Sequence, residues 1–186
     1  MKKNGILYMV ISALLCALGI LIPIVMPKIE IGPMSFTLAS HVPIFIAMFI
    51  SLPVAIAVSL VTTVGFFFAG FPMVVVLRAL SQIVFVLVGT LMLKKKGTLI
   101  ASWKTGVPFG LFLAVIHAAF EVIVVAGFYF GGSLGEQFYQ NGFIMSVLLL
   151  VGVGTIAHSM VDYAISVLIW KPCQHVIQIP VNAKVS

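Results

Sequence analysis

The stretch GILYMVISALLCALGILIPIVM, residues 5–26, decides the fold class, because it contains no charged side chain. A helix needs about 20 mostly apolar residues to cross the hydrocarbon core of a bilayer, roughly 30 Å thick. The run begins after Lys2 and Lys3 and ends at Pro27 and Lys28. It therefore predicts a membrane-spanning helix at the start of the chain.

The composition of the whole chain agrees with a membrane protein. Of its 186 residues, 62% are hydrophobic and 8% are charged, whereas a soluble domain carries roughly 25% charged residues. So few charges cannot cover a surface that faces water, so the outer surface must face lipid. The length suits one domain, residues 1–186.

Five further apolar runs predict an all-α bundle with six membrane spans. After the first span, the runs cover residues 41–53, 54–69, 72–93, 106–130 and 143–170. The second and third runs are short for full crossings, so the break at Pro53 could instead mark a helical hairpin.

The lysines predict the orientation, because positive charges near span ends resist translocation. With both termini in the cytoplasm, Lys28 alone of the lysines falls outside. The others then all lie inside: Lys2, Lys3, Lys94, Lys95, Lys96, Lys104, Lys171 and Lys184. The net charge of +6 is thus topological and does not indicate nucleic-acid binding.

Two outer segments have the composition of folded loops. Residues 27–40, PKIEIGPMSFTLAS, and residues 131–142, GGSLGEQFYQNG, mix apolar, polar and turn-forming residues. Loops of this kind often cover binding sites. Plain connectors are the alternative.

Ionisable residues inside the predicted spans are costly, and they usually face an internal cavity or each other. They are Arg78, the pair His117 and Glu121, and the pair His158 and Asp162. Each pair is four residues apart, so its members share one helix face.

The depths of these residues predict two separate polar groups. At 1.5 Å per residue, Arg78 lies roughly 9 Å and Glu121 roughly 14 Å below the outer span ends. Arg78, His117 and Glu121 are therefore candidates for an outer ligand site, or Arg78 and Glu121 form a purely structural pair. His158 and Asp162 are expected nearer the cytoplasm, as a structural contact.

Other motifs narrow the range of functions. Ala13 and Ala17 stand four residues apart in the first span, a spacing that allows close helix approach. The sequence contains no GxxxxGK[ST] or HExxH motif, and neither cysteine has metal or redox spacing. We therefore expect neither an enzyme, nor a metal site, nor a cofactor.

The chain resembles the substrate-capture subunits, or S components, of energy-coupling factor (ECF) vitamin transporters. The resemblance covers the whole chain. It is carried by the six-span layout, the small residues of the first span, and residues 35–80, SFTLASHVPIFIAMFISLPVAIAVSLVTTVGFFFAGFPMVVVLRAL. This block is similar to the small-vitamin branch, with niacin, hydroxymethylpyrimidine or pyridoxine as substrate.

The resemblance implies a vitamin site near the outer face of a bacterial cytoplasmic membrane. Arg78, His117 and Glu121 would supply polar contacts. The first loop, with Phe36, Thr37 and His41, and the later loop, with Tyr139 and Asn141, would form a lid. The resemblance also implies that Ala13 and Ala17 dock on a membrane scaffold subunit, which carries two ATPases.

Several alternatives stay open at this point. An aromatic carboxylate such as niacin would suit Arg78 and the phenylalanines of residues 66–68, whereas pantothenate would satisfy only the charge. A rival class is an independent proton-coupled carrier with His117, Glu121, His158 and Asp162 as a relay. Another is a membrane-assembly protein without a ligand.

Overall fold

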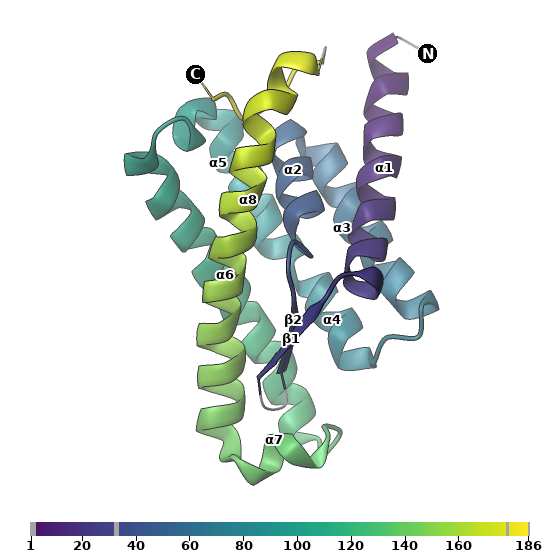
Figure 1. Cartoon of the computed structure of the whole chain (residues 1–186), viewed down its shortest axis with the longest axis vertical. Coiled ribbons are helices and arrows are strands. Elements are labelled where there is room, and N and C mark those ends of the chain that lie inside the picture. Colours follow the sequence, from purple (N-terminus) through teal and green to yellow (C-terminus); the bar gives the residue numbers. More distant parts are fainter. Residues whose placement is uncertain (1–2, 32–33, 178, 186) are drawn as a thin grey trace.

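The computed structural model describes residues 3–31, 34–177 and 179–185, and it confirms a helical bundle (Figure 1). A 3₁₀ turn, Gly97–Ile100, precedes α6, and a π-helical stretch, Ile144–Val153, continues directly into α8. The helices are α1 (Lys3–Val25), α2 (Val42–Ile50), α3 (Leu52–Phe68), α4 (Met73–Ser81), α5 (Ile83–Lys95), α6 (Trp103–Phe130), α7 (Glu136–Gln140) and α8 (Gly154–Val176).

Within the described residues, four helical segments are long and apolar enough to cross a membrane. They are Asn4–Val25, Met73–Lys95, Trp103–Phe130 and Ile144–Val176. The second of these combines α4 and α5, and α3 is a shorter apolar helix of 17 residues. The protein is therefore a polytopic membrane bundle, as the sequence predicts.

The second expected span, residues 41–53, is shorter than a full crossing and is broken next to Pro53, as its sequence suggested. α2 has nine residues, so at 1.5 Å per residue it is only about 13 Å long. It ends at Ser51, whose backbone is extended, and Pro53 then lies in the first turn of α3. Because proline is accepted in a first turn but not inside a helix, the sequence restarts a helix here.

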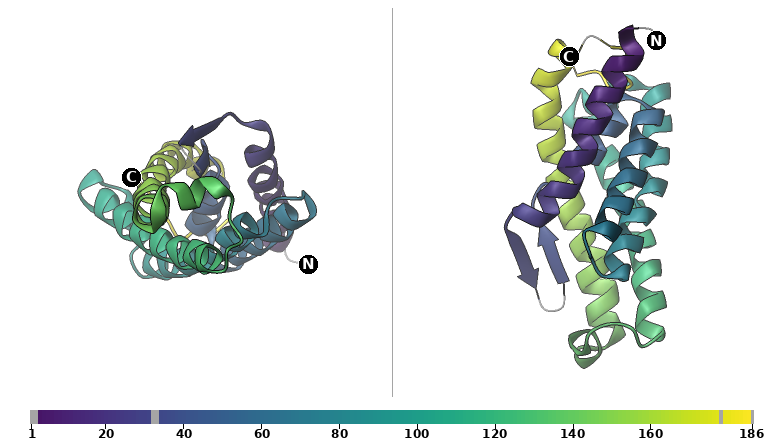
Figure 2. Two further views of the ribbon diagram at one scale, coloured as in Figure 1. Left: turned by 90° about the horizontal axis from the view of Figure 1, so that it is seen from below. Right: turned by 90° about the vertical axis from the view of Figure 1, so that its right-hand side faces the viewer.

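The first outer segment is folded, as expected, but as a β-hairpin within the otherwise helical protein. Strands β1 (Lys28–Ile31) and β2 (Met34–Thr37) are antiparallel, and Lys28 lies opposite Thr37. Figure 2 shows the hairpin extending beyond the end of α1, alongside the bundle. Strand β2 then leads into the bundle, where α2 begins.

Both ends of the chain lie at one end of the bundle, which we call the termini end (Figure 1). The Tyr8 hydroxyl donates to the Pro180 carbonyl at 2.6 Å, and the Lys184 N–H donates to the Gly97 carbonyl at 2.9 Å. The lysine run at residues 94–96 therefore shares this end. We call the opposite end, which carries the β-hairpin, the hairpin end.

The termini end contains a buried aromatic core. Phe49 and Trp170 are fully buried with ring centroids 5.7 Å apart. The C-terminal tail, residues 179–185, closes this core, with Ala183 fully buried. The N–H groups of Asn182 and Ala183 donate to the Phe49 carbonyl at 3.0 and 2.9 Å. The tail thus supplies partners for backbone carbonyls that the end of α2 leaves unpaired.

Helix α1 lies at the edge of the bundle, packed mainly on α3. Gly19 approaches Thr62 so closely that a Cβ atom there would meet the threonine hydroxyl. Ala13 and Ala17 lie on the exposed part of α1 instead. Their side chains are therefore not used for packing within the subunit.

Candidate binding cavity

A cavity of about 250 Å³ opens in the hairpin half of the bundle. Its walls come from the β-hairpin, the turn before α2, and helices α3, α4, α6 and α8. The lining combines aromatic rings with charged and hydrogen-bonding groups, as small-molecule sites do. The lining residues that matter below are Lys28, Phe36, Thr37, Ser40, His41, Thr62, Phe66, Phe71, Arg78, Gln82, Glu121 and His158.

An ion pair between α4 and α6 forms one wall of the cavity. Arg78 Nη2 donates to Glu121 Oε2 at 2.9 Å, and the Thr155 hydroxyl donates to the same oxygen at 2.6 Å. The Glu121 side chain is 4% exposed and that of Arg78 is 17% exposed. The contact is the Arg78–Glu121 pair that the sequence offered as one alternative, and a ligand role for either residue stays a prediction.

Two hydrogen-bonding groups in the cavity wall are buried without a partner among the described residues. They are Arg78 Nε and Thr62 Oγ1. A buried polar group without a partner costs about 1–3 kcal/mol. Each of these atoms therefore carries a desolvation cost within the cavity wall.

The charges lining the cavity do not balance. Lys28 and Arg78 are cations and Glu121 is an anion, so the described lining residues carry a formal charge of +1. Lys28 Nζ lies 5.9 Å from the centroid of the Phe71 ring, which stacks on Phe66 at 4.7 Å. This wall thus offers aromatic faces beside an excess positive charge.

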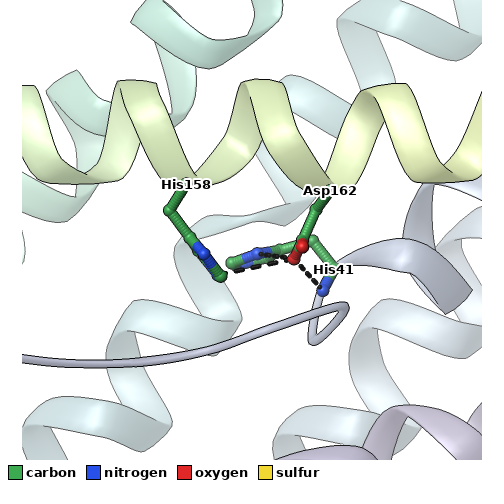
Figure 3. Close-up of side chains that lie close together, drawn as sticks. All are labelled: His41, His158 and Asp162. Atoms are coloured by element: carbon green, nitrogen blue, oxygen red, sulfur yellow. Dashed lines mark hydrogen bonds and ion pairs between the residues drawn. The ribbon is translucent and has the colours of Figure 1, made fainter. Parts of the chain in front are cut away.

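A hydrogen-bond network around the fully buried Asp162 of α8 lies behind the opposite wall, which is lined by His41 and His158 (Figure 3). Asp162 Oδ1 accepts from the Ala39 N–H at 2.8 Å, and Oδ2 accepts from the His41 N–H at 2.9 Å. Ala39 has a left-handed backbone, with φ of 66°, which is unfavourable for alanine. The carboxylate therefore fixes a strained turn where the hairpin enters α2.

The expected separation of the polar residues into two groups is wrong. His41 contacts both groups, with ring centroids 4.8 Å from His117 and 4.9 Å from His158. Because the first loop enters the bundle as a strand, it carries His41 down to Asp162. The polar residues therefore form one continuous site, and His158 lines the same cavity as Arg78.

Of the residues that the structure describes, His41, His158 and Asp162 have the spacing of a metal site, with ligand atoms within 4.8 Å of one another. His41 Nδ1 lies 3.1 Å and His158 Nε2 lies 3.4 Å from Asp162 Oδ2. However, the carboxylate already accepts from two backbone N–H groups and faces both imidazoles, which uses about all of its lone pairs. The geometry favours a hydrogen-bond network over metal coordination.

The structure brings together most of the predicted site residues. Phe36, Thr37, His41, Arg78 and Glu121 all line the cavity. His117 lies behind the wall, with Nδ1 2.8 Å from Ser159 Oγ and Nε2 3.4 Å from Glu121 Oε1.

The predicted lid residues of the later loop lie elsewhere. The Tyr139 hydroxyl donates to the Tyr129 carbonyl at 3.2 Å, and the Asn141 amide donates to the Gln137 carbonyl at 3.4 Å. Neither residue lines the cavity in this structure. Their part in covering a ligand stays a prediction.

Sequence reasoning missed several lining residues. Lys28 entered only the prediction of topology. It is the single lysine expected on the outer side, and this was a usable signal for a binding role. Phe71 sits in the turn between α3 and α4, next to the phenylalanines already noted at residues 66–68. Ser40 and Gln82 carry no distinguishing pattern in a single sequence.

Comparison with known proteins gives one informative match. The chain is 40% identical over 163 residues to the niacin transporter NiaX of Lactococcus lactis subsp. cremoris (strain MG1363), covering 87% of this chain and 72% of that relative. No protein-family model matches the chain. No solved structure matches it at a significant level.

A polytopic helical bundle with a polar, ring-lined cavity has the architecture of a membrane-embedded protein with a small-molecule site. Together with the extent and identity of the match, this places the chain in a transporter family rather than among enzymes. The chain belongs to the vitamin-capture subunits (S components) of ECF transporters, in the family of NiaX.

Proposed function

We propose that this subunit captures niacin, as the pyridine-3-carboxylate anion, in the cavity between the hairpin and helices α3, α4, α6 and α8. The observation that carries the proposal is the excess positive charge of the lining, from Lys28 and Arg78 against Glu121. A monoanion balances that charge. The stacked rings of Phe66 and Phe71 offer a flat apolar surface for an aromatic ring.

The neutral amide of the same ring and the uncharged vitamin pyridoxine would leave the charge unbalanced. Pantothenate would balance it but would leave the aromatic faces without a ring to stack on. The 40% identity to a protein named as a niacin transporter supports the same choice.

Calorimetric titration of the purified subunit with nicotinate, nicotinamide, pyridoxine and pantothenate tests this proposal. We expect nicotinate to bind tightest, by at least about tenfold over nicotinamide, because an ionic hydrogen bond contributes about 1.5–3 kcal/mol. Mass spectrometry of small molecules released from the denatured protein supplies an independent test. Tighter binding of an uncharged vitamin would contradict the proposal.

We further propose that the subunit crosses the bacterial cytoplasmic membrane six times, with both termini in the cytoplasm. It would dock there on a membrane scaffold subunit that carries two ATPases. The exposed Ala13 and Ala17 on the outer side of α1 support this docking face, because small residues let two helices approach closely within a membrane.

Substitutions on α1 test the docking. We expect Ala13→Trp and Ala17→Trp to abolish vitamin uptake and co-purification with the scaffold while leaving ligand affinity intact. Ile123→Trp on α6, at a position that is 63% exposed, is the matched control and should retain uptake. Normal complex formation by both α1 variants would remove this face from the interface.

A further inference from the structure

The network around Asp162 leaves one hydrogen-bond donor without an acceptor. Assigning hydrogens to the two imidazoles shows which group this donor is. An ionised carboxylate only accepts hydrogen bonds. His41 Nδ1, 3.1 Å from Asp162 Oδ2, must therefore carry a hydrogen and donate it. His158 Nε2 makes only a 3.4 Å ion-pair contact with that oxygen. We assign it a hydrogen as well, since a nitrogen lone pair facing the carboxylate would be repelled.

These assignments decide the role of Ser40, which lies between the two imidazoles. Its Oγ is 3.3 Å from His41 Nδ1 and 3.0 Å from His158 Nε2. Both neighbouring nitrogens carry hydrogens, so Ser40 Oγ accepts from His158 and finds no acceptor in either ring. A hydroxyl also donates one hydrogen bond. Since Ser40 lines the cavity, its hydrogen is available to a ligand.

We propose that the Ser40 hydroxyl donates a hydrogen bond to the ring nitrogen of a pyridine carboxylate whose carboxylate lies toward Arg78 and Lys28. This inference rests on the proposed niacin function and deepens it. His158 acts as a positioning residue, because it occupies the serine oxygen and directs the hydroxyl hydrogen into the cavity. The site thereby selects ligands by the nitrogen atom of the ring as well as by the charge of the carboxylate.

Benzoate separates this hydrogen bond from every other contact, because it has the charge and nearly the shape of nicotinate but carries a C–H group in place of the nitrogen. A buried donor left without its acceptor costs about 1–3 kcal/mol. The wild-type subunit should therefore prefer nicotinate over benzoate by about ten- to a hundredfold.

Calorimetric titration of the purified full chain with both compounds tests the proposal. In Ser40→Ala, the affinity for nicotinate should fall about tenfold or more, while the affinity for benzoate should change little. The ratio of the two affinities should therefore fall toward one. Ser40→Thr, which retains a hydroxyl, should keep the preference. His158→Ala should reduce the preference without weakening benzoate.

Ser12→Ala is the matched control, since the Ser12 hydroxyl donates to the Tyr8 carbonyl on α1 and lines no part of the cavity. It should behave as the wild type. An unchanged preference in Ser40→Ala would overturn the proposal. So would loss of the preference in Gln82→Leu with Ser40 intact, because Gln82 also lines the cavity and would then be the residue that contacts the ring nitrogen. A wild-type protein that binds no nicotinate would instead overturn the proposed function, so the two failures are distinguishable.

Discussion

The two halves of the bundle are built on different principles. At the termini end, Phe49, Trp170 and Ala183 have no exposed surface, and the C-terminal tail supplies hydrogen-bond partners for the end of α2. At the hairpin end, the cavity lies among the helices and is bordered by buried ion pairs and imidazoles, beside a smaller apolar cluster of Val125, Val147 and Val151. One half is closed by apolar packing, and the other stays open around polar groups.

This difference shows how a small membrane bundle can keep an open site. Buried polar and charged groups add little stability over apolar packing, so the site half cannot be the main source of stability. The packed half holds the helices in place, and α6 and α8 extend into both halves. Mutations in the packed half should therefore change stability, and mutations in the cavity half should change affinity.

The largest expected effect is on stability, from Trp170→Ala. Trp170 is fully buried, and its Nε1–H donates to the Ala183 carbonyl at 3.2 Å. Truncating a buried aromatic residue costs about 3–5 kcal/mol, so the unfolding free energy in detergent should fall by that amount. Trp103, which is 76% exposed, is the control, and Trp103→Ala should cost far less. Similar unfolding midpoints for both variants would contradict the contrast between the two ends.

The next effect is on affinity, from Arg78→Ala. Removing one side of a buried charge pair costs about 2–5 kcal/mol, so the binding free energy of nicotinate should become less favourable by an amount in that range. Arg78→Lys should also weaken binding, because an ammonium lacks the planar two-pronged geometry. Titration of each variant with nicotinate measures the loss.

A double variant separates ligand binding from charge balance. Arg78→Met with Glu121→Leu removes the whole ion pair and leaves no uncompensated buried charge. We expect it to fold and still bind nicotinate weakly. Full affinity in the double variant would show that Arg78 serves only to balance Glu121.

A smaller effect is expected from Phe71→Ala. The ring stacks on Phe66 and, in our proposal, on the ligand, and such aromatic contacts contribute about 0.5–1.5 kcal/mol. Nicotinate affinity should fall accordingly. Phe68, from the same aromatic segment but 80% exposed, is the control, and Phe68→Ala should leave the affinity unchanged. Equal losses in the two variants would exclude a specific role for Phe71.

The smallest effect is expected from Lys28→Met. Lys28 lies on an exposed strand, so its attraction for an anion is screened and contributes up to about 1 kcal/mol. The loss in affinity should appear at about 0.1 M salt, where the Debye length is about 10 Å. It should shrink at about 1 M salt, where the Debye length is about 3 Å. A loss that does not depend on salt would indicate that Lys28 contacts the ligand inside the cavity.

The sequence predicted the membrane helices and the Arg78–Glu121 pair because both follow from distance along a helix. Apolar length locates the spans, and the rise per residue places the two charges at one depth. The resemblance to ECF capture subunits added Phe36, Thr37 and His41, and the structure places all three in the cavity wall.

The arrangement around Asp162 could not be predicted in this way. It depends on how far the first loop enters the bundle, and helical periodicity contains no information about a hairpin. Because β2 leads the first loop into the bundle before α2 begins, His41 reaches Asp162 of α8 and joins two groups that depth arithmetic had separated. Ser40 and Lys28 enter the site through the same hairpin, which explains why both were missed.

The C-terminal tail has a consequence for the synthesis of the protein. The carbonyls at the end of α2 receive their partners from Asn182 and Ala183, which the ribosome makes after all of the helices described above. Until then, the termini end has polar backbone groups without their final partners and an apolar core without its cover. Insertion of the helices and completion of the fold are thus separate events in time. A chain released before residue 182 would be inserted but unfinished, with these carbonyls and this core left uncovered.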